Sequence, residues 1–112
     1  MRILIFGGTG FLGKNLVDFL LKKHYDIGLY VRPLTIQQKF IREKKNLLDL
    51  KIGEFQQEDD FESLVRGYDI VYHLISSTKP GVINPLQDIE TTIKPSLRLL
   101  EACVKEEVKR VV

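Results

Sequence analysis

The residues whose types and spacing could serve chemistry in this sequence are three glycines near its start. Gly7, Gly10 and Gly13 follow the apolar run of residues 3–6 and open the amphipathic segment of residues 12–23. Because glycine has no Cβ, the backbone can turn sharply there and approach a bound group closely. The first turn of a helix also presents unpaired N–H donors and the positive end of the helix dipole. The pattern therefore predicts a site for the pyrophosphate of a dinucleotide.

The sequence around the glycines favours this interpretation over two alternatives. A strand of the buried type precedes the turn and a helix with an apolar face follows it, which is the context that a dinucleotide fingerprint requires. One alternative is a glycine-rich turn without a ligand. The other is the phosphate loop of nucleotide hydrolases, which needs a Ser or Thr hydroxyl for Mg²⁺ where this chain has Asn15. The expected apolar face of the helix comprises Leu12, Leu16, Phe19 and Leu20.

Length and composition indicate one globular domain, residues 1–112. Of the 112 residues, 44% are hydrophobic and 29% are charged. The apolar runs are too short to span a membrane, and residues 1–6 have the pattern of a strand rather than of a signal peptide. The net charge is only +2, with basic residues scattered among acidic ones, so we expect no nucleic-acid partner. Cys103 is the single cysteine and no Cys/His cluster has metal-ligand spacing, so we expect no metal and a cytoplasmic location.

Strands and helices are expected to alternate along the chain. After the first strand and helix, strands are predicted at residues 27–31, 69–75 and 108–112, and residues 51–55 are predicted as the tail of a third strand within the ambiguous stretch of residues 48–55. This alternation predicts right-handed βαβ units and an α/β fold, a Rossmann-type doubly wound parallel sheet of order 3-2-1-4-5, truncated at the fifth strand. Ligands of such sheets bind beyond the carboxyl ends of strands 1 and 4, so the glycine turn and the polar loop of residues 76–81 should border one crevice.

Three further helices are expected, at residues 36–46, around Phe61 and at residues 86–107. Pro95 should bend the last of these, because proline has no N–H to donate and its ring crowds the preceding turn. The expected caps are Thr35 for the first helix and Asp59 or Asp60 for the second. Apolar spacing assigns the buried face of the long helix to Ile89, Ile93, Leu97, Leu100 and Val104.

Four pieces of the sequence, in their order and spacing, resemble the extended short-chain dehydrogenase/reductases, and within them the NAD-dependent epimerase/dehydratase family that acts on nucleotide sugars. They are the GGTGFLG turn, Tyr-His-Leu at 72–74, Leu-Leu-Glu-Ala at 99–102 and Val-Lys-Arg-Val-Val at 108–112. The resemblance covers all 112 residues and corresponds to the N-terminal part of such an enzyme. It implies a bound NAD(P) and, in the full-length form, a nucleotide-sugar substrate.

The resemblance also implies which residues contact the cofactor. Glu54 and Phe55 lie beside the adenine, and Ser76 and Ser77 hydrogen-bond the nicotinamide ribose or the diphosphate. On turn preference alone, these serines could equally belong to a solvated loop. His73 is expected as a packed strand residue rather than a catalyst. The pyrophosphate is held by Gly7, Gly10, Phe11, Leu12 and Gly13.

Arg32 bears on the choice between NAD and NADP. Relatives that prefer NAD place an acidic residue after the second strand, to pair with the ribose 2′-hydroxyl, whereas an arginine suits the 2′-phosphate of NADP. This chain has Val31 followed by Arg32. We therefore expect NADP to be favoured over NAD, unless Arg32 only stacks on the adenine or faces water.

The catalytic pair of the family is expected outside these residues. The family uses a tyrosine followed four positions later by a lysine, which meet on one helix face. The tyrosines of this chain are followed at that spacing by Leu29, Leu34, Tyr72 and Ser76. We therefore expect the cofactor-binding part of an epimerase, dehydratase or reductase that acts by hydride transfer at a sugar carbon, inactive as this chain alone.

Two alternatives to an enzyme stay open. One is a non-catalytic NADP-sensing module of the same superfamily, because Thr92 and Pro95 replace an Asn and a Gly common in the family. The other is an interaction domain without a ligand. In relatives the long helix often pairs with a second subunit, so a homodimer is possible, with Cys103 in its interface or in the core.

Overall fold

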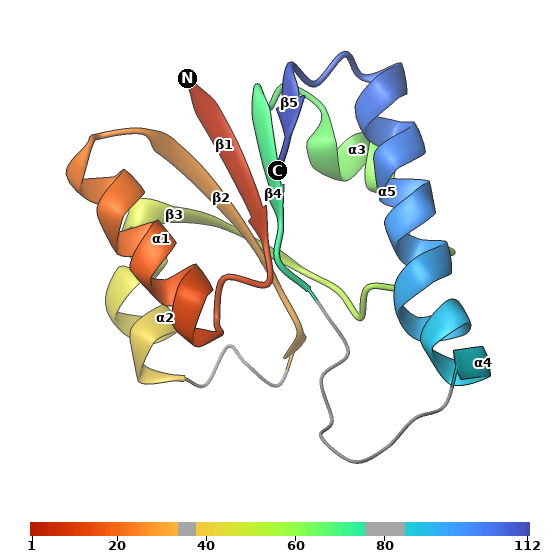
Figure 1. Cartoon of the computed structure of the whole chain (residues 1–112). Coiled ribbons are helices and arrows are strands. Elements are labelled where there is room, and N and C mark those ends of the chain that lie inside the picture. The colour runs from red at the N-terminus through yellow and green to blue at the C-terminus, as the bar shows by residue number, and fades with distance from the viewer. Residues whose placement is uncertain (34–37, 76–84) are drawn as a thin grey trace.

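A computed structural model describes residues 1–33, 38–75 and 85–112 of the chain. Its centre is a five-stranded sheet in the order β3-β2-β1-β4-β5, in which every pair of neighbouring strands is parallel. This order confirms the predicted topology (Figure 1). The strands are β1 (Arg2–Phe6), β2 (Asp26–Val31), β3 (Leu48–Ile52), β4 (Ile70–His73) and β5 (Arg110–Val111).

Helices cover both faces of this sheet. α1 (Phe11–Lys22) and α2 (Lys39–Lys44) pack on one face, and α3 (Phe61–Val65) and α5 (Lys94–Lys105) on the other (Figure 1). Within the described ranges, no helix is long and apolar enough to cross a membrane. The other helical segments are η2 (Lys45–Leu47), a 3-10 turn, and α4 (Pro85–Asp88) and η3 (Ile89–Ile93), which precede α5.

β1 contributes to the hydrophobic cores on both faces because successive side chains of a strand point to opposite sides. Ile3 and Ile5 pack with the α1 and α2 side, whereas Leu4 and Phe6 pack with the α3 and α5 side, and all four are buried. A strand covered on both faces needs apolar residues at consecutive positions. The unbroken run of residues 3–6 therefore predicted the central strand correctly.

Aromatic rings fill the core at the carboxyl ends of the strands. Phe6 stacks against Tyr30 with 4.7 Å between ring centroids, and Phe55 meets Phe61 edge to face at 5.6 Å. Such pairs add about 0.5–1.5 kcal/mol each beyond the apolar area they bury. The edge of the sheet that borders the candidate site therefore packs on a buried layer of aromatic rings.

The buried face of α5 differs from the predicted one. Leu99, Ala102 and Cys103 are buried against the sheet, whereas Leu97 is 55% exposed. The helix carries two apolar stripes, and the one with Leu99, Ala102 and Cys103 packs in the core against the sheet. We call the other the outer stripe; it comprises Leu86, Ile89, Ile93, Leu97, Leu100 and Val104, all exposed.

The bend expected at Pro95 takes the form of a π-helical turn just before it. The N–H of Lys94 bonds to the carbonyl of Ile89, five residues back, at the end of η3. Pro95 has no N–H, and the hydroxyl of Ser96 donates to the carbonyl of Thr92. The long helix is therefore continuous, with one widened turn before the proline.

Other expectations about the helices are confirmed only in part. The buried face of α1 consists of Gly13, Val17 and Leu20, whereas Leu12 and Phe19 are exposed, contrary to prediction. Asp60 caps α3 by accepting a hydrogen bond from the N–H of Ser63. α2 begins only at Lys39, and Thr35 lies outside the described residues.

β3 ends earlier in the sequence than predicted. It spans Leu48–Ile52, so Gly53, Glu54 and Phe55 follow the strand instead of ending it. Phe55 has the left-handed backbone conformation, with φ of 56°. A strand cannot continue through that conformation, so the chain leaves the sheet here.

The corrected face of α5 predicts different effects for two leucines. Leu99→Ala should lower the free energy of unfolding by about 3 kcal/mol, because it leaves a cavity in the core. Leu97→Ala, on the outer stripe, should lower it by less than about 1 kcal/mol at concentrations low enough to keep the chain monomeric. Urea unfolding followed by circular dichroism measures both. Equal losses would contradict the orientation of α5.

Candidate cofactor site

Four strands of the sheet end at one edge. Phe6 of β1 lies opposite Tyr30 of β2 and His73 of β4, and Val31 of β2 lies opposite Ile52 of β3. Because the strands are parallel, the segments that follow them gather at this carboxyl edge. It therefore brings together the glycine turn, Arg32, the segment after β3 and the end of β4, where open α/β sheets bind their ligands.

Gly7 and Gly13 are required by the fold itself. Gly7 has a φ of 88°, and a Cβ there would lie 2.8 Å from the carbonyl carbon of Leu74, beyond the end of β4. A Cβ at Gly13 would lie 2.5 Å from the carbonyl oxygen of Gly7 and 2.6 Å from the Cα of Gly8. The absence of a Cβ at these two positions therefore allows α1 to start close to the turn after β1, and the turn to lie beside the end of β4.

Gly10 differs from these two, because the described structure gives no steric reason for a glycine there. It forms the N-cap of α1 with a φ of −73°, which any residue can adopt. A Cβ at Gly10 would meet no described atom within 4 Å. The space beside it opens at the amino terminus of a twelve-residue helix, where N–H donors favour an anion. A closely bound pyrophosphate would account for the missing side chain.

The residues after Gly10 expose apolar side chains at the same place. Phe11 is 88% exposed and Leu12 is 67% exposed. Their main-chain N–H groups belong to the first turn of α1, which has no helical carbonyl to bond. Both residues were predicted to contact the pyrophosphate, and their positions are compatible with main-chain binding.

A hollow of about 530 Å³ lies at the same edge, beyond β2 and β3. Arg32, which follows β2, and Glu90 and Thr91 of η3 are among the residues that line it. Three carboxylates share this hollow with the arginine, so its charge is mixed. The lining residues are Arg32, Glu54, Phe55, Gln56, Gln57, Glu58, Glu90 and Thr91.

The predicted adenine residues line this hollow in different ways. Glu54 is exposed, whereas Phe55 is only 2% exposed and its ring packs among other aromatic rings. Phe55 therefore offers a ligand little beyond its main chain. Ser76 and Ser77, predicted to contact the nicotinamide ribose or diphosphate, lie outside the described residues.

His73 is packed between the end of β4 and α5, as expected. Its Nε2 lies 2.8 Å from the Ser96 hydroxyl, and its ring centroid lies 5.4 Å from that of Phe55. Because the Ser96 hydroxyl donates to Thr92, its oxygen accepts from His73, so Nε2 carries the proton. Nδ1 is buried without a described partner, and burial lowers the pKa of His73.

The other reactive side chains near the core are held in protonated forms. Burial first, and then hydrogen bonds to Asp59 and Asp49, raise the pKa values of Tyr30 and Tyr68. Burial also raises the pKa of the Cys103 thiol to about 11. None of these groups is poised as a base or nucleophile at neutral pH. In the described part of the chain, no group of three or more His, Cys, Asp or Glu could hold a metal ion.

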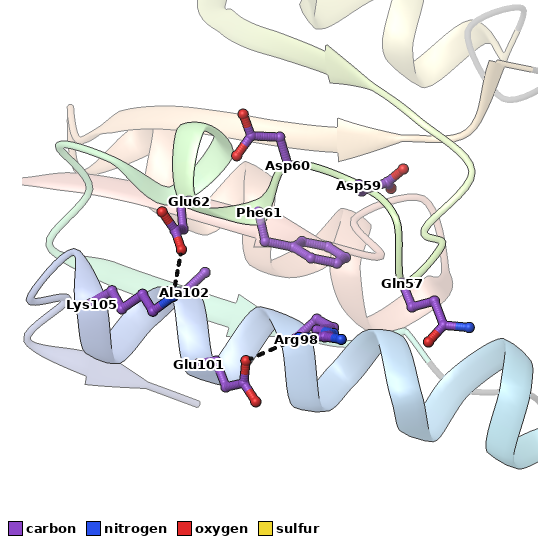
Figure 2. Close-up of a pocket in the computed structure, with 9 residues that line it drawn as sticks. All are labelled: Gln57, Asp59, Asp60, Phe61, Glu62, Arg98, Glu101, Ala102 and Lys105. Atoms are coloured by element: carbon purple, nitrogen blue, oxygen red, sulfur yellow. Dashed lines mark hydrogen bonds and ion pairs between the residues drawn. The ribbon is translucent and has the colours of Figure 1, made fainter.

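A second hollow, of about 200 Å³, lies between α3 and α5 (Figure 2). Its charges are paired across and along the helices: Glu62 bonds Lys105 at 3.0 Å, and Arg98 bonds Glu101 at 3.5 Å. Asp60 points away from α5 in Figure 2 and is engaged as the cap of α3. This hollow therefore lacks the features of a reactive site.

The sequence of this chain is similar to a protein-family model and to several known proteins. Residues 3–112 match the model of the NAD-dependent epimerase/dehydratase family. The chain belongs to this family. It is 33% identical over 114 residues to anthocyanidin reductase ((2S)-flavan-3-ol-forming) of Vitis vinifera, covering 96% of the chain and 34% of the relative. It is 34% identical over 122 residues to the uncharacterized UDP-glucose epimerase YtcB of Bacillus subtilis, covering 97% of the chain and 38% of the relative.

Solved structures of family members have the same architecture. UDP-glucose 4-epimerase of Thermotoga maritima, solved with UDP-glucose, aligns with a TM-score of 0.79 at 26% identity, over 99% of the chain and 36% of that protein. UDP-glucose 4-epimerase of Thermus thermophilus, in complex with NAD, aligns with a TM-score of 0.78 at 25% identity, over 99% and 36%. The chain spans roughly a third of the length of these relatives.

Within this family member, several residues at the edge were not anticipated from the sequence. Gln56, Gln57 and Glu58 line the larger hollow because the chain leaves the sheet at Phe55, and Glu90 and Thr91 reach it through the π turn. The proline five residues after Glu90 was the one signal of an irregular turn there. No spacing or motif in the sequence indicated that Gln56, Gln57 and Glu58 would line the hollow.

His73 should make folding stability depend on pH. Its pKa is lowered in the folded state, so the unfolded chain takes up the proton first as pH falls through about 6.5. The stability that His73 contributes as a neutral group is therefore present above about pH 6.5 and lost below it. His73→Gln should reduce this loss between pH 7.5 and 5, measured by urea unfolding. The control is His24→Asn, at an exposed turn with φ of 62°, and an unchanged slope in His73→Gln would contradict the prediction.

Proposed function

We propose that residues 1–112 form the NAD(P)-binding Rossmann domain of a nucleotide-sugar epimerase, dehydratase or reductase that acts by hydride transfer at a sugar carbon. The observation that carries the proposal is the open space at Gly10, at the start of α1 and on the carboxyl edge of the sheet. The similarity to UDP-glucose epimerases supports the substrate class. Bound NAD(P) would supply the hydride acceptor, and these residues would hold and orient it.

The base for such a reaction would come from other residues. Tyr30 and Tyr68 are engaged with aspartates and keep their protons, because their pKa values are raised. Neither they nor Tyr25 and Tyr72 have a lysine four positions later. We therefore propose that the catalytic tyrosine and lysine, and the sugar site, lie outside these 112 residues.

The cofactor that Arg32 favours is NADP. Arg32 follows β2 at the carboxyl edge and lines the larger hollow, where a guanidinium could pair with a 2′-phosphate. Glu54, Glu58 and Glu90 line the same hollow and would repel the negative charge of a 2′-phosphate, so we expect only a moderate preference for NADP over NAD. We also propose a reducing, cytoplasmic location, because Cys103 is the single cysteine of these residues and has no partner for an internal disulfide.

A non-catalytic NADP-binding module is the second candidate. Arg32 in the hollow favours it, together with Thr92 and Pro95, which shape the widened turn of the long helix. Turnover of any UDP-sugar by a form of the protein that includes the catalytic pair would exclude this module.

We also propose that the outer stripe pairs two copies of the chain. Its residues recur at spacings of three and four, as in the seam between two helices, and acidic and basic side chains flank it. Related subunits meet most often about a twofold axis, which lets one stripe cover its own copy.

Calorimetric titration with NADP⁺ and NAD⁺ tests the cofactor site. The chain should bind both saturably, NADP⁺ more tightly, and Gly10→Val should weaken both by more than about tenfold because its side chain fills the open space. Arg32→Ala should weaken NADP⁺ alone by about tenfold. Asn15→Val, exposed one turn later on α1, is the matched control and should bind as the parent does.

Two outcomes of this titration would contradict the proposal. The parent chain could fail to bind either dinucleotide while its circular dichroism shows that it is folded. Alternatively, Gly10→Val could bind as tightly as the parent, which would place the ligand away from the glycine turn. Equal loss of NAD⁺ and NADP⁺ in Arg32→Ala would contradict the NADP preference only.

Sedimentation velocity tests the pairing of two copies. The chain should sediment as a dimer at micromolar concentration, and Leu97→Glu should shift it to a monomer by placing a charge in the outer stripe. Leu47→Glu is the matched control, because Leu47 is similarly exposed but belongs to η2 and not to the outer stripe. A monomeric parent, or a dimer that survives Leu97→Glu, would contradict the proposed interface.

A further inference from the structure

The segment of residues 53–59 joins β3 to α3 without regular secondary structure of its own. Its residues line the larger hollow on one side, from Glu54 to Glu58. A different hollow, of about 360 Å³, is lined by Tyr30, Gly53 and Asp59 among others. The segment of residues 53–59 therefore lines two hollows, and we call it the wall; its position needs a specific support.

The support is the hydroxyl of Tyr30, which makes two hydrogen bonds to this segment. It donates to Oδ2 of Asp59 at 2.8 Å and accepts from the main-chain N–H of Phe55 at 2.7 Å. The same carboxylate oxygen accepts from the N–H of Gln56 at 3.2 Å. One tyrosine and one aspartate thus satisfy two consecutive N–H groups of the wall. We call this pair the Tyr30–Asp59 clamp.

The clamp holds the chain in an unusual conformation. Phe55 has a φ of 56°, which is rare for a residue with a large side chain. Its ring is fixed by the rings of Phe6, Tyr30 and Phe61, with centroids 5.6 to 6.3 Å away. Packing alone fixes the side chain, whereas the clamp fixes the peptide on either side of it.

The tyrosine also fits the main chain of Gly53 closely. A Cβ at that glycine would lie 2.2 Å from the Tyr30 hydroxyl oxygen, so the hydroxyl occupies the place of a side chain. Tyr30 itself is only 2% exposed and belongs to β2. The position of the wall is therefore fixed by a buried residue of the sheet and not by contacts exposed to solvent.

We propose that Tyr30 and Asp59 are positioning residues for the adenosine end of the dinucleotide, acting through the main chain of residues 53–57. This inference rests on the proposed cofactor site. Neither side chain needs to touch the ligand, because the clamp sets where Glu54 and Gln56 stand in the larger hollow. The raised pKa of Tyr30 keeps its hydroxyl a donor throughout the neutral range.

The chain contains an internal control for this inference. Tyr68 is also buried, donates to Asp49 at 2.9 Å and lies where a Cβ of Gly28 would be 2.3 Å from its hydroxyl oxygen. Asp49 and Gly28 belong to β3 and β2, and Tyr68 precedes β4, at the opposite edge from the glycine turn. Removing the Tyr68 hydroxyl therefore removes a buried tyrosine–aspartate hydrogen bond like that of Tyr30, but leaves the hydrogen bonds of the wall in place.

The test compares Tyr30→Phe with Tyr68→Phe, using AMP, nicotinamide mononucleotide and the tighter of NAD⁺ and NADP⁺ as probes. Tyr30→Phe should weaken AMP and the dinucleotide by about fivefold and leave nicotinamide mononucleotide unchanged. Tyr68→Phe should lower the unfolding temperature comparably and leave all three affinities unchanged. A purely structural role would not produce this split between the two halves of the cofactor.

Asp59 provides a second variant if Tyr30→Phe folds poorly. Asp59→Ala should weaken AMP about as much as Tyr30→Phe, and Asp59→Asn, which keeps an acceptor oxygen, should restore most of the affinity. The double variant should lose little more than either single one, because both act on one segment.

Two results would overturn the inference, and they are distinguishable. Unchanged AMP affinity in folded Tyr30→Phe and Asp59→Ala chains would overturn the clamp's role and leave the cofactor site standing. Failure of the folded parent to bind AMP and both dinucleotides would overturn the proposed function, and the inference with it.

Discussion

The contact between the main chain of α1 and the turn that follows β1 is the constraint on which the candidate site depends. Gly13 lies so close to the carbonyl of Gly7 that any Cβ would push the helix away from the sheet. With the helix in this position, its first turn points its N–H groups at the carboxyl edge, and Gly7 can lie against the end of β4. In the proposed cofactor site, phosphate binding would therefore depend on the packing of this helix on the glycine turn and not on basic side chains.

The sequence predicted the features that depend on local chemistry. The glycine spacing identified the turn, the unbroken apolar run identified β1, and alternation of elements gave the strand order. The face of α5 was predicted wrongly because both stripes are apolar, and periodicity does not say which one meets the sheet. Leu99, Ala102 and Cys103 meet the sheet because they pack with core residues of β1 and β4, which are distant from them in sequence.

The positions of the candidate-site residues could also be predicted only in part, because some of them depend on contacts between residues distant in sequence. Gly10 and Arg32 follow directly from strand ends, so their place at the carboxyl edge needed only the topology. Gln56 and Glu58 line the hollow only because Phe55 turns the chain out of the sheet, under the influence of a hydroxyl 25 residues earlier. Such hydrogen bonds join residues that are distant in sequence, so hydrophobic periodicity does not reveal them. The backbone conformations that they stabilise cannot be predicted from local conformational propensity either.

The two buried tyrosines also constrain how this sequence can change. Each hydroxyl occupies the space of a glycine's missing Cβ, Tyr30 at Gly53 and Tyr68 at Gly28. A larger residue at either glycine is compatible with the fold only if the facing tyrosine becomes smaller, and the aspartate then loses its donor. The three positions of each set should therefore vary together among homologues, as linked substitutions within β2, β3 and the segments beside them, so sequence covariation would carry a record of both contacts.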